Sequence, residues 1–194
     1  MADAFTVLIP AAAVLWVLLP AYLASAFATL PKGRGPPMDF GREWPWDHRR
    51  VLGPSKTWSG FLVGVFLPVP IGLLEAWLIL IAPPNLAVVP SFGPTVVAAI
   101  PVVFLLTIGA MSGDALGSFI KRRLNRPSGS RALLLDQLPF VVVPVVFGVL
   151  LYPEIFVPVF GNLLGIFWLV FYTLVLHILF NWVGYRLGTK KVPW

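Results

Sequence analysis

Long apolar runs constrain this chain more than any other feature. Five such stretches lie at about residues 5–30, 58–82, 96–119, 139–152 and 159–187. Each is roughly as long as the ~20 residues that a helix needs to cross the hydrocarbon core of a bilayer, except the fourth, which is short. Charged residues make up only 11% of the chain, whereas soluble domains carry about 25%. We therefore predict an all-α, polytopic membrane protein with five transmembrane helices in one domain, residues 1–194.

The basic residues predict the orientation of these helices. The connections near residues 83–95 and 153–158 contain no lysine or arginine. All 14 basic residues lie in three other segments: Lys32, Arg34, Arg42, Arg49, Arg50 and Lys56; Lys121, Arg122, Arg123, Arg126 and Arg131; Arg186, Lys190 and Lys191. Cytoplasmic loops carry an excess of such residues. We expect a multi-pass protein of the cell membrane with its N-terminus outside, its C-terminus in the cytoplasm, and cytoplasmic loops at about 31–57 and 120–138.

The first apolar run does not have the charge pattern of a cleaved signal peptide. Asp3 precedes the run, and Lys32 and Arg34 follow it, whereas a signal peptide carries positive charge before its apolar core. We expect the run to remain as a transmembrane helix. Cysteine is absent and only two histidines occur, so disulfides and thiolate metal sites are excluded. A bound metal would have to rely on oxygen ligands.

The stretch GPSKTWSG, residues 53–60, stands directly before the second apolar run. It is not a Walker phosphate loop, because the required glycine spacing and the preceding strand are both missing. Its physics still suits an anion: Ser55 is placed to cap the helix that follows, and the amides of the first helical turn are free to bind phosphate beside the Lys56 ammonium. The alternative is a capped helix start whose lysine extends to the membrane surface.

A second polar cluster, GDALGSFIKRR, continues the third apolar run out of the membrane. Gly109, Gly113 and Gly117 recur every four residues and predict close helix packing. Packing does not explain Asp114, because a carboxylate at the hydrocarbon edge costs roughly 2.5–3.5 kcal/mol and normally faces a partner or water. Helical spacing puts Ser118, Lys121 and Arg122 on the same face as Asp114.

Asp136, in LLDQLPF, is a third candidate at the same membrane boundary. It could be no more than a helix cap. Asp114 and Asp136, with Asp39 as a further candidate, could instead supply the hard oxygen ligands that Mg²⁺ prefers. His177 and Asn181 are expected to face the helix bundle, and Glu75 lies toward the outer side, away from this cluster.

These blocks resemble a known family of lipid nucleotidyltransferases. GPSKTWSG is similar to the Ser-Pro-Lys-Lys-Thr-x-Glu-Gly stretch of CDP-diacylglycerol synthases, and GDALGSFIKRR with LLDQL resembles their Gly-Asp-Leu-x-x-Ser-x-x-Lys-Arg and Asp-Arg-x-Asp signature. The similarity is closer to the archaeal branch, the CDP-archaeol synthases, across nearly the whole chain. Two bacterial elements, Lys-Asp-x-Gly and His-Gly-Gly, are missing after Arg123, and a single acid, Asp136, stands where the bacterial signature has two.

The resemblance implies transfer of CMP from CTP to the unsaturated archaetidic acid 2,3-bis-O-(geranylgeranyl)-sn-glycerol 1-phosphate, with release of pyrophosphate and with one or two Mg²⁺ ions as cofactor. The residues to which we assign roles are Lys56, Asp114, Asp136 and Lys121 for catalysis; Ser55, Lys56, Thr57 and Arg50 for the CTP phosphates; Ser118, Lys121, Arg122 and Arg123 for the lipid phosphate or pyrophosphate; and Asp114, Asp136 and Asp39 for metal. The expected partners are CTP, the isoprenoid lipid phosphate and membrane lipids, without nucleic acid or a protein partner.

Three alternatives remain. A bacterial-type enzyme would act on ester phosphatidic acid, although the two missing elements argue against it. A CDP-alcohol phosphatidyltransferase would carry the run Asp-Gly-x-x-Ala-Arg, which is absent. A small transporter of anionic solutes would place charges near the membrane midplane and break its helices in paired halves, whereas the polar residues here gather at one face.

Overall fold

The computed structural model of the chain describes residues 4–83, 88–127 and 132–189. Within these ranges the regular structure is entirely helical, apart from two isolated bridges, Pro37 with Thr57 and Glu43 with Arg50. The helices are α1 (Ala4–Phe27), α2 (Trp58–Phe66), α3 (Val69–Ile81), α4 (Val96–Arg123), α5 (Leu133–Gln137), α6 (Pro139–Leu151), α7 (Pro153–Phe160) and α8 (Leu163–Arg186). The prediction of an all-helical protein is confirmed.

Four helical segments among the described residues are long and apolar enough to cross a membrane: Leu8–Phe27, Trp58–Ile81, Val96–Arg123 and Leu163–Arg186. Helix α6, Pro139–Leu151, is apolar but has 13 residues, about 20 Å of helix at 1.5 Å per residue. These segments support a multi-pass membrane protein. The fifth crossing and the direction of the termini stay predictions.

The second of these segments is interrupted. Helix α2 ends at Phe66 and α3 begins at Val69, because Pro68 lacks the amide proton that would continue the ladder of hydrogen bonds. Pro70 follows within the first turn of α3, where a missing amide costs nothing. The break lets α2 pack on α1 and α4 near one end of the bundle, while α3 continues along α4 to the other.

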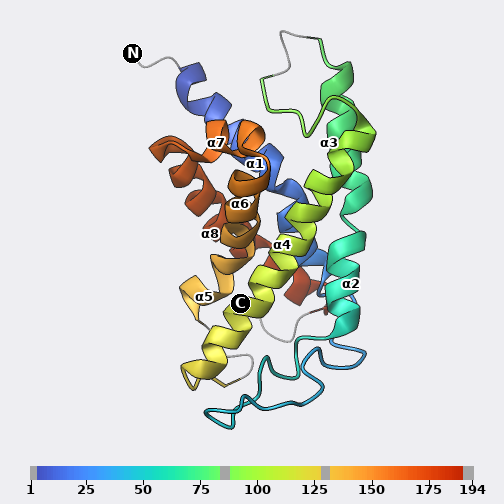
Figure 1. Cartoon of the computed structure of the whole chain (residues 1–194), viewed down its shortest axis with the longest axis vertical. Helices are drawn as coiled ribbons and strands as arrows, with labels where there is room; N and C mark the ends of the chain where they lie inside the picture. Colours follow the sequence, from blue (N-terminus) through green and yellow to red (C-terminus); the bar gives the residue numbers. More distant parts are fainter. Residues whose placement is uncertain (1–3, 84–87, 128–131, 190–194) are drawn as a thin grey trace.

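Helix α4 runs the length of the bundle and organises its packing (Figure 1). It contacts α1, α2, α3, α5 and α6. The three predicted glycines lie where α4 meets α5 and α6: a Cβ atom at Gly109 would collide with Pro144, one at Gly113 with the Pro139 carbonyl, and one at Gly117 with the Leu135 carbonyl. The close packing expected from their spacing is confirmed.

Helix α1 fills the centre of the bundle. Val14, Val17, Leu18 and Ala21 are completely buried, and α1 contacts each of the long helices and α6. Near its C-terminal end the Tyr22 hydroxyl lies 3.2 Å from Oγ1 of Thr173 on α8, inside the core. This contact joins α1 to α8 close to the point where α1 enters the irregular segment 28–57.

That segment, the start of α2, the C-terminal end of α4 and α5 lie at one end of the molecule, the lower end in Figure 1. We call it the basic end, since the segment and the last turn of α4 carry most of the chain's lysines and arginines. The predicted site residues are all found here.

Candidate functional site

The turn before α2 has a defined geometry. Gly53 adopts φ +107°, a left-handed conformation that favours glycine. The chain then pairs briefly with residues 36–38: the Met38 amide donates to the Lys56 carbonyl at 2.8 Å, and the Trp58 amide donates to the Pro36 carbonyl at 3.0 Å. These two backbone bonds, at the Lys56 carbonyl and at Trp58, therefore fix the chain as it leaves the turn.

The predicted cap at Ser55 is wrong. Helix α2 starts at Trp58, and Thr57 is the N-cap, with Oγ1 accepting from the Gly60 amide at 3.2 Å. A capping side chain must stand directly before the first helical residue, and Ser55 lies two positions too early. Ser55 is exposed in the turn, whereas Thr57 is buried and its hydroxyl serves the helix.

Lys56 faces Asp114. Its Nζ lies 2.5 Å from Oδ2 of Asp114, and the two side chains keep 23% and 30% of their surfaces exposed. The pair joins the turn before α2 to α4, about two-thirds of the way along that helix, and the two residues are 58 apart in sequence. An ion pair with this much access to solvent can exchange partners, and it joins one group suited to phosphate with one suited to a hard cation.

Lys121 and Asp136 form a second pair of the same kind. Nζ of Lys121 lies 2.5 Å from Oδ1 of Asp136, and Oδ2 of Asp136 accepts from the Ala132 amide at 2.8 Å. The pair spans α4 and α5, whose backbones approach each other at Gly117. Asp114 and Lys121 are seven residues apart on α4, about 10 Å along the axis, so the two pairs are neighbours along one helix.

Asp39 has a different environment. Its side chain is fully buried, and four groups donate to it: the Gly41 amide and Arg50 Nη2 to Oδ1, and the Leu52 and Gly53 amides to Oδ2, at 2.6–3.1 Å. Burial alone would raise the pKa of this carboxyl, but the hydrogen bonds from Arg50 and the three amides outweigh it and hold the pKa well below its ordinary value. Asp39 is thus an ionised carboxylate with its acceptors occupied.

The remaining predicted residues lie at the end of α4. The Ser118 hydroxyl donates to the Leu52 carbonyl at 3.1 Å, and Nη2 of the buried Arg122 donates to the Pro127 carbonyl at 3.1 Å. Arg123 pairs with Asp47 at 3.0 Å. Ser118 and Arg123 therefore contact the 28–57 segment through polar bonds, a function that the helical face seen in the sequence did not indicate.

The three candidate carboxylates differ in how well they fit a metal ion. Within the part of the chain that is described, no three histidine or acidic side chains gather closely enough to hold one. Asp114 and Asp136 fit in part, as partly accessible hard oxygen donors that could share an ion with phosphate oxygens and water, as Mg²⁺ commonly does. Asp39 does not fit, because both its oxygens already accept two hydrogen bonds each.

Sequence reasoning missed several residues at this end. Asp47, Arg49 and Trp44 make specific contacts to α4, where Phe119 packs edge-on against Trp44 at 5.0 Å between ring centres. The run DFGREWPWDHRR contains the charges and aromatic rings that could have drawn attention. Nothing in the run itself indicates which helix they would meet.

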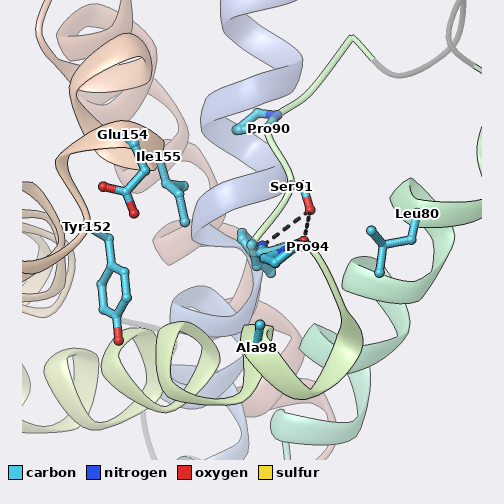
Figure 2. Close-up of a pocket in the computed structure, with 10 residues that line it drawn as sticks. Leu80, Pro90, Ser91, Pro94, Ala98, Tyr152, Glu154 and Ile155 are labelled. Atoms are coloured by element: carbon cyan, nitrogen blue, oxygen red, sulfur yellow. Dashed lines mark hydrogen bonds between the residues drawn. The ribbon is translucent and has the colours of Figure 1, made fainter.

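A cavity of about 630 Å³ lies at the opposite end of the molecule, between the end of α3, the start of α4 and the start of α7 (Figure 2). Tyr152, Glu154 and Ile155 line one side and Leu80 the other, with Pro94 between them. Its lining is mostly apolar and includes none of the predicted site residues. The cavity is therefore separate from the site at the basic end.

Comparison with known proteins agrees with the resemblance seen in the sequence. The profile of the CarS-like family, described as CDP-archaeol synthase, matches residues 5–194. A CDP-archaeol synthase of Thermococcus gammatolerans is 42% identical over 180 residues, covering 93% of this chain and 94% of that protein. One from Methanosarcina acetivorans is 40% identical over 178 residues, covering 91% and 100%.

A solved structure, described as an intramembrane enzyme for archaeal membrane lipids biosynthesis, superposes with a TM-score of 0.64 at 28% identity and covers 86% of this chain and 91% of its own. The residues matched by the family profile, 5–194, include the helix bundle and both polar segments of the basic end. The chain belongs to the CDP-archaeol synthase family.

Proposed function

We propose that this protein is a CTP-dependent cytidylyltransferase that transfers CMP from CTP to 2,3-bis-O-(geranylgeranyl)-sn-glycerol 1-phosphate, forming CDP-archaeol and pyrophosphate. The observation that carries the proposal is the pair of lysine–aspartate contacts, Lys56 with Asp114 and Lys121 with Asp136, at one end of an apolar bundle. Family membership supports the reaction class.

The reaction joins two anions. An oxygen of the lipid phosphate forms a bond to the α-phosphorus of CTP, and the bond from that phosphorus to the bridging oxygen breaks as pyrophosphate leaves. No general base is needed, because the lipid phosphate is already ionised at neutral pH. Charge neutralisation and in-line positioning are therefore the main requirements. The ammonium groups of Lys56, in the turn before α2, and Lys121, in the last turn of α4, supply positive charge for them.

The lysines act on the phosphates. Lys56, in the turn with the exposed Ser55 and next to α2, binds the phosphates of CTP together with the half-exposed Arg50. Lys121, seven residues after Asp114 on α4, binds the lipid phosphate or the leaving pyrophosphate, with Arg122 beside it. Each lysine gives up its aspartate when phosphate arrives, and the freed carboxylate becomes available to a cation.

Asp114 and Asp136 would hold Mg²⁺, one ion or two, which when bound supplies positive charge at the reacting phosphate oxygens. Thr57 keeps its structural role as the N-cap of α2. With Asp39 occupied by its four donors, it has no part in metal binding.

The membrane placement is part of the same proposal and is supported by the distribution of basic residues. The basic end faces the cytoplasm, where CTP is found and where anionic lipid headgroups favour lysine and arginine. The N-terminus is outside, residues 139–152 complete a fifth crossing, and residues 1–194 form one membrane domain. The apolar outer surfaces of the helices, such as Leu62 and Phe66 on α2, allow the isoprenoid chains to leave sideways into the bilayer.

Two labels of CTP test the reaction. Purified protein in lipid nanodiscs with Mg²⁺ and the unsaturated ether lipid phosphate should form a labelled lipid from CTP carrying label on the α-phosphate. Label on the γ-phosphate should appear in pyrophosphate only. The same assay with ester phosphatidic acid tests the bacterial-type alternative, which predicts that this lipid is the better substrate. An assay of CTP uptake into proteoliposomes tests the transporter alternative, which predicts uptake. Absence of any labelled product with either lipid would contradict the proposal.

A further inference from the structure

Residues 49–53 form a short segment that ends at Gly53, the first residue of GPSKTWSG. Carbonyl groups of this segment accept hydrogen bonds from side chains of α4. Nη2 of Arg123 donates to the carbonyls of Arg49 at 3.2 Å and Arg50 at 2.7 Å. The Ser118 hydroxyl donates to the Leu52 carbonyl at 3.1 Å. Three of the five carbonyls in this segment therefore accept hydrogen bonds from side chains of α4.

The amides of the same segment are held from another direction. Leu52 and Gly53 donate to Oδ2 of Asp39 at 3.1 and 2.9 Å, and Arg50 Nη2 reaches Oδ1 at 2.6 Å. The segment is thus fixed by α4 through its carbonyls and by Asp39 through its amides. Lys56 follows three residues later, so its position is set by both attachments.

The Arg123 guanidinium is itself held on several sides. Nη1 lies 3.0 Å from Oδ1 of Asp47, and the guanidinium carbon lies 4.9 Å from the ring centre of Phe119 and 5.7 Å from that of Trp44. In return, Nη1 of Arg49 donates to the Arg123 carbonyl at 3.0 Å. Arginine suits such a place, because its planar group pairs with a carboxylate, donates in several directions and stacks on rings.

We propose that Arg123, held by Asp47, is a positioning residue: it fixes the 49–53 segment on α4 and thereby places Arg50 and Lys56 for the CTP phosphates, and it does not itself bind substrate phosphate. This inference rests on the proposed function. It replaces the phosphate-binding role that the sequence assigned to Arg123, and it gives Asp47 a role that the sequence did not assign.

A double-mutant cycle separates positioning from phosphate binding. If Arg123 acts through the segment, Arg123→Ala and Asp47→Asn both raise the KM for CTP, by about tenfold or more for Arg123→Ala, and leave the KM for the lipid unchanged. The double variant is then little worse than Arg123→Ala. Arg123→Lys keeps the charge but loses the second donor and the ring contacts, so it also raises the KM for CTP.

If Arg123 instead binds the lipid phosphate or pyrophosphate, Asp47→Asn behaves like the wild type, Arg123→Ala raises the KM for the lipid, and Arg123→Lys restores much of the activity. That pattern would overturn the inference. Arg126→Ala is the matched control, since Arg126 is an exposed arginine three residues further along, outside the site. It should leave both KM values unchanged.

A second readout needs no turnover. Trypsin should cleave after Arg49 and Arg50 faster in folded Arg123→Ala and Asp47→Asn than in the wild type or in Arg126→Ala. Equal cleavage rates in all four proteins would contradict the attachment. If the wild type makes no CDP-lipid but the cleavage rates differ as expected, the proposed function fails while the attachment stands, so the two failures can be told apart.

Discussion

Lys56 Nζ and Asp114 Oδ2 lie 2.5 Å apart and connect the turn before α2 to α4. Both side chains keep part of their surface exposed, so the contact is accessible from the basic end. The pair holds Lys56, which we propose binds the CTP phosphates, next to Asp114, the proposed metal ligand. The candidate site is therefore assembled where the 28–57 segment docks on α4.

Exchanging the two residues tests whether the pair serves only to join α2 to α4. The double variant Lys56→Asp with Asp114→Lys keeps an ion pair between the same positions, so thermal stability should stay near that of the wild type. CDP-lipid formation should be lost, because the ammonium no longer stands beside the start of α2. Stability by a thermal unfolding scan in detergent and activity by labelled CTP are both needed; recovered activity in the exchanged protein would argue for a structural role alone.

The carboxylate of Asp39 predicts a pH dependence of stability. Its pKa is lower in the folded protein than in the unfolded chain, where it is about 3.9. The stabilisation is therefore fully present above that value and is lost as the pH falls toward the folded pKa. Asp39→Asn should lower the unfolding temperature clearly at pH 7, and the difference from the wild type should shrink at pH 3. A difference that stays constant over this range would contradict the assigned hydrogen bonds.

The contact of α4 with α6 predicts a strong effect of one methyl group. Gly113→Ala places a Cβ against the Pro139 carbonyl, a backbone atom that cannot move aside as a side chain can. Overpacking of this kind costs about 1–3 kcal/mol, so the variant should unfold at a lower temperature or express poorly. Ser112→Ala, at the exposed neighbouring position, is the control and should behave like the wild type. Equal stability of the two variants would mean that α4 and α6 are further apart.

Glu75 on α3 is buried, and among the residues that the structure describes neither of its carboxyl oxygens has a hydrogen-bond partner. A buried polar group without a partner costs about 1–3 kcal/mol. Glu75→Leu, of similar size, should therefore raise the unfolding temperature, whereas Glu154→Leu at the exposed start of α7 should not. A fall in stability for Glu75→Leu would show that the carboxyl group has a stabilising partner.

Apolar runs and basic segments were enough to predict an all-helical membrane protein. The thickness of the hydrocarbon core sets the length of an apolar run, and the cytoplasmic side of a membrane protein is enriched in lysine and arginine. The glycine spacing on α4 also predicted close packing. Helix starts were less certain: the cap at Thr57 differs from the predicted Ser55 by two residues, since several hydroxyl side chains stand in the same turn.

The partners of the site residues could not be predicted. Lys56 and Asp114 are 58 residues apart, and only the docking of residues 28–57 on α4 brings them together. Asp39 was a candidate metal ligand because the sequence does not show which groups donate to its carboxylate. Three of its four donors are backbone amides, those of Gly41, Leu52 and Gly53. The contacts of Arg123 were hidden for a similar reason, since two of them are backbone carbonyls.

The rate of CDP-lipid formation in three variants tests the central claim most directly. Initial rates should be measured with α-labelled CTP, Mg²⁺ and the unsaturated ether lipid phosphate for the wild type, Lys56→Ala, Asp114→Asn and the control Arg126→Ala. Lys56→Ala and Asp114→Asn should each lower turnover by ~10²-fold or more while remaining folded and monodisperse, and Arg126→Ala should not. Near-normal rates in both Lys56→Ala and Asp114→Asn would contradict the placement of the site.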